Sequence, residues 1–324
     1  MRRLAAIGID SYMILLLLAA ALGLVLPARG GGADLLSHVT FWAVALLFFL
    51  YGARLDPSAI RAELLNLRLQ ALTLGATYVL FPVVGLGLAG LGRGVLGPEL
   101  AQGVAFLAML PSTVQSSVAF TSIAGGNVAA AICAASLSNI LGVVLTPLLV
   151  ARLMHLQGGG VSLEAIERIG LQILLPFVIG QGLRPLIGQF VRAHRRLTLA
   201  VDRGSILLIV YAAFGASTVS GLWSAIPLRG IVLSLAVIAL FLALAMAAMA
   251  AAGRLAGLAL GDRAVLFFCG STKSLASGLP IAAAIFPPAA LGATVLPVMM
   301  YHMLQLLVCS VIARRMALAA SAPG

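Results

Sequence analysis

The chain consists of long apolar runs separated by short polar segments, and this pattern predicts ten membrane-spanning helices. Several runs reach or approach the roughly 20 residues that a helix needs to cross a bilayer. The short segments of alternating apolar and polar residues that are typical of a transmembrane β-barrel do not occur. The sequence therefore predicts an all-α polytopic membrane protein. The expected spans have the approximate limits 8–28, 35–53, 69–91, 100–124, 128–151, 167–187, 203–223, 230–253, 263–286 and 291–313.

Composition supports a membrane protein, since 62% of the residues are hydrophobic and only 9% are charged, far outside the usual range for soluble domains. The net charge of +11 does not indicate a nucleic-acid-binding protein, because the arginines are spread over the segments between spans. If the N-terminus is cytoplasmic, most arginines lie in cytoplasmic segments. By the positive-inside rule we expect a multi-pass protein of the plasma membrane (the inner membrane in bacteria) with both termini in the cytoplasm.

The two halves of the chain share one layout of spans. Gly158-Gly159-Gly160 lies near the middle, and the pairs Ser112-Thr113 and Ser271-Thr272 occupy corresponding positions in spans four and nine. Five spans in each half would give the halves opposite orientations in the membrane, which is the inverted-repeat architecture of secondary transporters. We therefore expect a first repeat over residues 1–157 and a second over residues 161–324.

Spans four and nine are both interrupted by helix-breaking residues. Pro111 precedes a run of hydroxyl and amide side chains in span four, and Gly270, Gly278 and Pro280 surround the polar centre of span nine. Proline removes a backbone donor. Unwound backbone in a membrane is tolerated where it lines a cavity, so paired broken helices in the two halves indicate a binding site. The alternative is that these small polar residues only permit close helix packing.

The polar side chains of these two spans are the candidates for binding a substrate or an ion. They are Ser112, Thr113, Gln115, Ser116, Ser117, Ser271, Thr272, Lys273, Ser274 and Ser277. Asn139 in span five and His302 and Gln305 in span ten are further candidates, because they are polar groups in apolar surroundings. A lone histidine in a helix bundle, however, is more often a structural residue.

Lys273, the only lysine of the chain, lies near the middle of span nine. An ammonium group in a bilayer segment costs from roughly 3 kcal/mol to more than 10 kcal/mol, so such a residue is a candidate functional site. Three mechanisms compete: a tethered cation in place of sodium, a direct partner of an anionic substrate, or a group that releases and takes up a proton. The structural alternative is a lysine that snorkels to the interface. On a continuous helix Lys273 would share a face with Ser277, and Ser271 would share one with Ser274.

The sequence contains no motif of a metal centre, a cofactor site or a nucleotide-driven pump. Cys133, Cys269 and Cys309 fall within apolar runs without metal-ligand spacing, so we expect them to be small buried side chains. Neither a phosphate-binding glycine-rich loop nor an ATPase motif occurs. We therefore expect no cofactor, with sodium or a proton as the coupling ion.

The chain resembles the bile acid:sodium symporter superfamily, and within it the SBF-like branch, which is sometimes grouped with cation:proton antiporter-like carriers. The segments that carry the resemblance are 111–117, 126–129, 269–280 and Tyr301-His302. The resemblance implies a panel of spans 1, 2, 6 and 7 and a core of spans 3–5 and 8–10, in which spans four and nine cross at their broken centres. It also implies ion-coupled transport of a small organic anion across the lipid bilayer by alternating access.

The chain departs from sodium-coupled members of that superfamily at several positions of the usual ion and substrate sites. The positions are Ser271 for a glutamate, Ser116-Ser117 for a Ser-Asn pair, Thr77 for a glutamine, and Ala276 and Met303 for asparagines. The loss of the carboxylate matters most, since the ammonium of Lys273 would repel a nearby sodium ion. At 5 Å and an effective dielectric constant of 20 that repulsion is about 3 kcal/mol. Sodium at the usual positions is therefore doubtful, while Thr77 remains a candidate site residue.

Two other classes of function are open. One is a membrane sensor or regulator that has the same fold but does not transport. The other is an intramembrane hydrolase in which Ser271, Ser274 or Ser277 pairs with Lys273. Hydroxyl groups dispersed through both halves fit a symmetric cleft better than a single nucleophile, so we do not expect an enzyme. Reactivity toward a fluorophosphonate probe would distinguish the hydrolase from a carrier.

Overall fold

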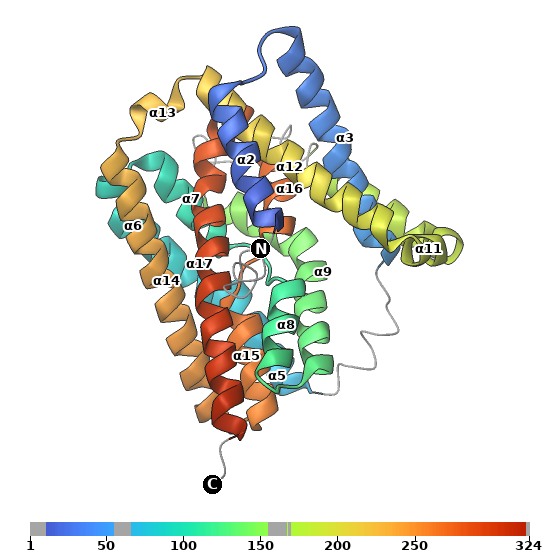
Figure 1. Ribbon diagram of the computed structural model, residues 1–324, viewed down its shortest axis with the longest axis vertical. Helices are drawn as coiled ribbons and strands as arrows, with labels where there is room; N and C mark the ends of the chain where they lie inside the picture. Colours follow the sequence, from blue (N-terminus) through green and yellow to red (C-terminus); the bar gives the residue numbers. More distant parts are fainter. Residues whose placement is uncertain (1–10, 55–65, 155–166, 168–169, 322–324) are drawn as a thin grey trace.

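The computed structural model describes residues 11–54, 66–154, 167 and 170–321, and every regular element in these residues is a helix (Figure 1). In chain order the elements are α2 (Ser11–Val25), α3 (Gly31–Arg54), α5 (Leu67–Gly75), the π-helical turn η1 (Ala76–Leu80), α6 (Phe81–Leu96), α7 (Pro98–Ala108), α8 (Gln115–Ile123), α9 (Val128–Leu153), the π-helical turn η2 (Gly170–Leu174), α11 (Leu175–Ala193), α12 (Arg195–Val219), α13 (Leu222–Ala225), α14 (Leu228–Leu255), α15 (Leu260–Ser271), α16 (Leu275–Ile285) and α17 (Pro288–Ser321).

Eight helices of the described residues are long and apolar enough to cross a membrane, by length and composition. They are Gly31–Arg54, Leu67–Leu96, Val128–Leu153, Gly170–Val191, Arg195–Val219, Leu228–Leu255, Leu260–Ile285 and Pro288–Ala319. Each overlaps one of the expected spans, so the chain is a multi-pass helical membrane protein. Of the other two expected spans, the first corresponds to the 15 residues of α2, and the fourth is divided into α7 and α8. The triple glycine at 158–160 lies outside the described residues.

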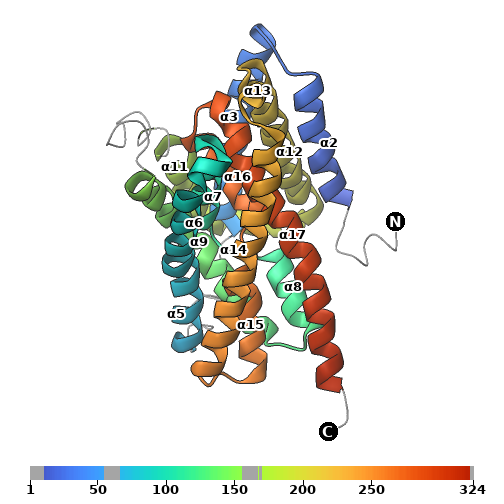
Figure 2. The same cartoon turned by 90° about the vertical axis from the view of Figure 1, so that its left-hand side faces the viewer.

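Figures 1 and 2 show two groups of helices that are offset along the long axis of the molecule. In the first group α3 packs against α11, and α12 packs against α2 and α3. The second group contains α5 to α9 and α14 to α17. In both views the lower ends of α5, α14, α15 and α17 extend well below the first group. Because α16 and α17 contact α12, and α16 also contacts α3, the second group is joined to the first mainly through its last two helices.

The close contact between α3 and α11 depends on two glycines. A Cβ atom at Gly52 would collide with the carbonyl oxygen of Phe177, and one at Gly180 would collide with the carbonyl oxygen of Phe49. Lipid supplies no hydrophobic driving force between helices, so close van der Waals contact between small residues has to hold them together. Each glycine is therefore needed for the close packing of α3 against α11.

Asp262 connects the starts of three helices in the second group. Its carboxylate accepts hydrogen bonds from Nδ2 of Asn66 (2.9 Å) and Nδ2 of Asn127 (3.1 Å). These two asparagines cap α5 and α9, because their side-chain oxygens accept from the backbone N–H groups of Leu69 (3.2 Å) and Ala130 (3.1 Å). Asp262 lies in the first turn of α15. The start of α15 is thereby held against the starts of α5 and α9.

Replacing Gly180 by alanine is expected to lower the thermal unfolding temperature of the purified protein by several degrees, because the new methyl group forces α3 and α11 apart. Overpacking of this kind costs about 1–3 kcal/mol. Gly182→Ala on the same helix is the matched control, since nothing lies within 4 Å of the position of its Cβ atom. Equal unfolding temperatures for the two variants would show that the contact at Gly180 is not tight.

Candidate substrate and ion site

Two non-helical breaks lie in the middle of spans four and nine, the two spans in which interruptions were predicted. The first comprises residues 109–114, between α7 and α8, and the second comprises residues 272–274, between α15 and α16. The two breaks bond directly to one another, since the N–H of Ser274 donates to the carbonyl of Pro111 (2.8 Å). Ser112 Oγ of the first break also donates to the carbonyl of Cys269 in α15 (2.6 Å). We call the two breaks together the crossover.

The second break begins later than the sequence suggested. α15 continues through Gly270 to Ser271, and the backbone becomes extended only at Thr272, with φ −101° and ψ 150°. A Cβ atom at Gly270 would collide with the sulfur of Met249 in α14. This glycine therefore allows two helices to pack closely, and it does not itself open the helix.

Every carbonyl of residues 109–113 accepts a hydrogen bond from a neighbouring element. The donors are Thr146 Oγ1 to Met109 O (2.8 Å), Lys273 Nζ to Leu110 O (2.7 Å), Ser274 N to Pro111 O (2.8 Å), Asn139 Nδ2 to Ser112 O (2.6 Å) and Ser117 Oγ to Thr113 O. An unpaired backbone group in an apolar environment costs several kcal/mol. The first break is therefore stabilised by hydrogen bonds from α8, α9 and the second break, which together satisfy all five carbonyls.

Gln305 of α17 stabilises the second break. Its Oε1 accepts from the backbone N–H of Lys273 (2.8 Å), and its Nε2 donates to the carbonyl of the same residue (2.9 Å). The side-chain amide thus pairs with the backbone of Lys273 as a neighbouring β-strand would. Nε2 also lies 3.0 Å from His302 Nδ1, and Tyr301 donates to the carbonyl of Ser271 (2.7 Å). One face of α17 therefore fixes the backbone of the break.

The side chain of Lys273 is enclosed by backbone carbonyls and has a relative exposure of only 1%. Its Nζ donates to the carbonyls of Thr77 (3.0 Å), Ala108 (3.1 Å) and Leu110 (2.7 Å). It also lies 4.0 Å from the centre of the Phe81 ring, within the range of a cation–π interaction. Ala108 is the last residue of α7, so its carbonyl is one of those that a helix end leaves without a partner. We call these three carbonyls and the ring the lysine cage.

The carbonyl of Thr77 is available to the lysine cage because of the π-helical turn η1. In this turn the N–H of Phe81 bonds to the carbonyl of Ala76, five residues earlier. The next residue, Pro82, has no N–H to donate. The carbonyl of Thr77 therefore has no donor in its own helix, and Lys273 supplies one.

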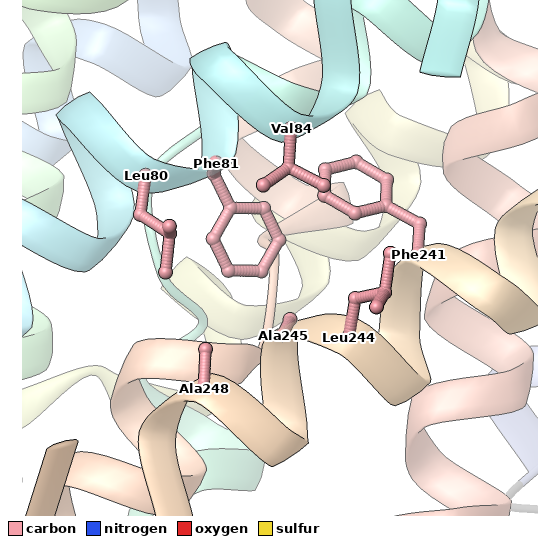
Figure 3. Close-up of a pocket in the computed structure, with 7 residues that line it drawn as sticks. All are labelled: Leu80, Phe81, Val84, Phe241, Leu244, Ala245 and Ala248. Atoms are coloured by element: carbon pink, nitrogen blue, oxygen red, sulfur yellow. The ribbon is translucent and has the colours of Figure 1, made fainter. Parts of the chain in front are cut away.

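Phe81 is held in place by other aromatic rings. Its ring centre lies 5.0 Å from that of Phe241 and 6.4 Å from that of Tyr301. Phe81 also lines a small apolar pocket between α6 and α14 (Figure 3). The other residues that line this pocket are Leu80, Val84, Phe241, Leu244, Ala245 and Ala248. The pocket has no polar side chain in its lining, so we place the candidate site on the crossover.

The starts of α8 and α16 form the accessible part of the crossover. Gln115 and Ala276 are exposed, and Ser116 and Asn139 are half-buried. Asn139 links the first break to the first turn of α16, because its Nδ2 donates to the carbonyl of Ser112 and its Oδ1 accepts from Ser277 Oγ (2.6 Å). A ligand at this surface would meet amide and hydroxyl groups and the first N–H groups of two helices. The start of α8 has no side-chain cap.

Two of the faces predicted from helical spacing are wrong, because the helix is broken where it was expected to continue. Lys273 points into the lysine cage, whereas Ser277 bonds to Asn139. Ser271 donates to a carbonyl of its own helix α15 (2.5 Å), whereas the side chain of Ser274 caps α16. Because residues 272–274 are not helical, the side chains of Ser271, Lys273 and Ser274 point in different directions.

Several other predicted hydroxyls bond within their own segment. Thr77 Oγ1 donates to Thr73 O (2.9 Å), Thr272 Oγ1 donates to Phe268 O (2.8 Å), Ser117 Oγ donates to Thr113 O, and Thr113 Oγ1 lies 2.9 Å from Ser116 Oγ. At Thr77 the carbonyl, not the predicted hydroxyl, bonds to the central lysine. The prediction of buried cysteines is confirmed, since Cys133, Cys269 and Cys309 are buried and free.

Four residues around the crossover were missed by sequence reasoning. Thr146 donates to a carbonyl of the first break, and Tyr301 donates to the carbonyl of the last residue of α15. Ser138 Oγ accepts from the N–H of Ser112 (3.0 Å), and Phe81 covers the lysine. Thr146 and Ser138 are polar residues in an apolar span, and Ser138 is next to Asn139. A polar residue within an apolar run is the same indication that made Asn139 and Gln305 candidates, so Thr146 and Ser138 could have been found. Nothing in the sequence distinguishes Phe81 from other phenylalanines of the chain.

Comparison with known proteins places the whole site within one family. Residues 10–318 match the sequence model of the SBF-like CPA transporter family. An uncharacterised protein of Pseudomonas aeruginosa is 44% identical over 310 residues, which cover 95% of this chain and 93% of that protein. Putative symporter YfeH of Escherichia coli is 41% identical over 307 residues, which cover 95% of this chain and 92% of that protein. Sodium/bile acid cotransporter 7 of Danio rerio is 26% identical over 306 residues, which cover 93% of this chain and 90% of that protein.

Replacing Gln305 by leucine is expected to lower the unfolding temperature strongly. The change leaves the N–H and the carbonyl of Lys273 without partners in a buried site, at about 1–3 kcal/mol for each group. Leu304→Met on the same helix is the control, because it changes neither volume nor polarity much. The measurement is thermal unfolding of the detergent-purified proteins. A Gln305→Leu protein as stable as the control would mean that the backbone of the break has other partners.

Proposed function

Because this chain belongs to the SBF-like CPA transporter family, we propose that it is a secondary active transporter that moves a small organic anion by alternating access, coupled to a proton or a sodium ion. The relatives are named as a putative symporter and as sodium/bile acid cotransporters. At the level of the family, the chain is a multi-pass membrane transporter and not an enzyme. The substrate, the coupling ion and the residues that bind them are the subject of the proposal.

The observation that carries the proposal is the pair of half-helices that start at the accessible face of the crossover. α8 and α16 both begin there, with Gln115 and Ala276 exposed. The N-terminal end of a helix carries a partial positive charge and unpaired N–H groups, and broken helices of transporters direct such ends at anionic substrate groups. The exposed amide of Gln115 and the half-buried hydroxyl of Ser116 add neutral polar groups beside them. This arrangement favours a carboxylate or a similar anion over a cation.

The arrangement of the helices supports an inverted-repeat carrier with ten spans. We assign the first repeat to residues 1–157 and the second to residues 161–324, with a panel of α2, α3, α11 and α12. The core would contain α5 to α9 and α14 to α17. The offset of the two groups in Figures 1 and 2 is the displacement that would result if the core slid along the panel. We place both termini in the cytoplasm and the protein in the plasma membrane, which in bacteria is the inner membrane.

The chemistry of the crossover argues against sodium as the coupling ion. Neither break contains a carboxylate, and the hydroxyl of Ser271 is bonded to its own helix. A sodium ion here would have only neutral oxygen ligands and would be repelled by Lys273.

The Ser-Lys hydrolase is not supported, because the hydrogen bonds described for Lys273 Nζ are all to backbone carbonyls. The sensor alternative differs from the carrier in one measurable property, which is flux.

The test of the proposal is uptake by proteoliposomes that contain the purified protein. Thermal-shift screening against organic anions, with taurocholate and small carboxylates among them, first selects a ligand. Uptake of that ligand is then measured under an imposed proton gradient and under an imposed sodium gradient. We expect accumulation that the proton gradient drives. Binding without flux under either gradient would favour the sensor over the carrier.

Replacing Ser116 by aspartate is expected to reduce anion uptake by roughly tenfold or more, because the new carboxylate occupies the start of α8 and repels the substrate. The same charge favours the helix itself, since a carboxylate in the first turn interacts well with the helix dipole. Ser116→Asn is the matched control, as it has the same shape without the charge. Uptake that is equal in the two variants would remove the start of α8 from the substrate site.

A further inference from the structure

The lysine cage has the composition of a binding site for a small cation. We propose that the carbonyls of Thr77, Ala108 and Leu110 and the ring of Phe81 form a monovalent-cation site, and that the side chain of Lys273 is the cation that occupies it permanently. The crossover then keeps its positive charge throughout the transport cycle and takes no cation from the medium at this position. Only this last consequence rests on the proposed function.

The hydrogen bonds of the side chain support an ammonium ion. All three polar contacts of Lys273 Nζ are backbone carbonyl oxygens, at 2.7–3.1 Å. A carbonyl oxygen can only accept, so Nζ has to donate three times. An ammonium group has three N–H donors, whereas a neutral amine has two. The ring of Phe81 at 4.0 Å adds an attraction that exists only for a cation.

The lysine cage is built from parts that do not depend on the lysine side chain. The carbonyl of Thr77 is freed by η1 and Pro82, and the carbonyls of Ala108 and Leu110 belong to the end of α7 and the first break. The backbone of Lys273 is fixed separately by the amide of Gln305 (2.8 and 2.9 Å). Removing the side chain should therefore leave the three oxygens directed at the space that the ammonium occupied.

The ligands of the lysine cage select the class of cation. It offers neutral oxygens and an aromatic face but no carboxylate, so it does not meet the preference of calcium or magnesium for charged oxygen ligands. An aromatic face attracts ammonium groups, and rings of backbone carbonyls coordinate potassium in channels. The C-terminal end of α7 adds the negative end of a helix dipole. We therefore expect ammonium and methylammonium to bind best, and potassium better than sodium.

The test removes the tethered cation and supplies a free one. In a buffer whose only cation is N-methylglucamine, Lys273→Ala is expected to unfold about 5–10 °C below the wild type, because the buried oxygens lose their donor. Ammonium or methylammonium should restore part of this loss, with a shift that grows with the logarithm of the cation concentration. The wild type should not respond to these cations at constant ionic strength, since its cage is filled.

Lys273→Met is the matched control, because its side chain fills much of the same space without charge. It should lose stability and should not respond to ammonium. The proposal is overturned if Lys273→Ala responds to none of these cations, or if both variants respond alike. It is also overturned if Lys273→Ala cannot be recovered even with ammonium present throughout purification, since the free cation should then replace the side chain.

A second measurement uses the wild-type protein. Because Lys273 is the only lysine, selective ¹⁵N labelling of the lysine side chain gives a single Nζ resonance in NMR spectra. We expect an ammonium resonance, coupled to three protons that exchange slowly with water, at neutral pH. A neutral amine, or an ammonium in fast exchange, would overturn the assignment. Neither measurement needs a substrate, so failure of the transport assay would leave both results interpretable.

Discussion

Backbone groups that leave a helix inside a bilayer need hydrogen-bond partners from the protein, because the surrounding lipid offers none. This constraint explains the polar side chains that surround the two breaks. Asn139 and Gln305 act where the two breaks lack a helical neighbour, and Thr146 and Tyr301 each satisfy one more carbonyl. The crossover is therefore non-helical but not loose. Its geometry is fixed by α9 and α17, the helices that supply these side chains.

The same breaks place helix ends of opposite partial charge on opposite sides of the crossover. The negative end of α7 faces the buried lysine, and the positive ends of α8 and α16 lie on the accessible side. A lysine whose three donors are all engaged cannot also bind a substrate. The charge of Lys273 is thus separated from the surface where we place the anion, although both belong to one crossing of two segments. Lys273 can influence the substrate through the field of the site without touching it.

The sequence allowed the main features to be anticipated, and the reasons for its failures are local. Long apolar runs located the spans, and Pro111 and the polar residues of spans four and nine located the breaks. The comparisons confirm the family that these residues resemble. Side-chain directions at the breaks were predicted wrongly, because helical spacing does not hold for residues 272–274. The carbonyl of Thr77 could not be anticipated, since a π-helical turn leaves no signature in composition and its effect depends on Pro82.

The π-helical turn η1 also has a consequence for the length of the chain. A π-helical turn contains one residue more than an α-helical turn would, so deleting a single residue within Tyr78–Leu80 would restore regular α-helix. The segments on either side would keep nearly the same relative orientation, because the wide turn absorbs the extra residue. Thr77 would then lie four residues before Pro82, which has no N–H, so its carbonyl would still lack a donor in its own helix. Related chains that keep the lysine can therefore differ by one residue here, but they should keep the proline.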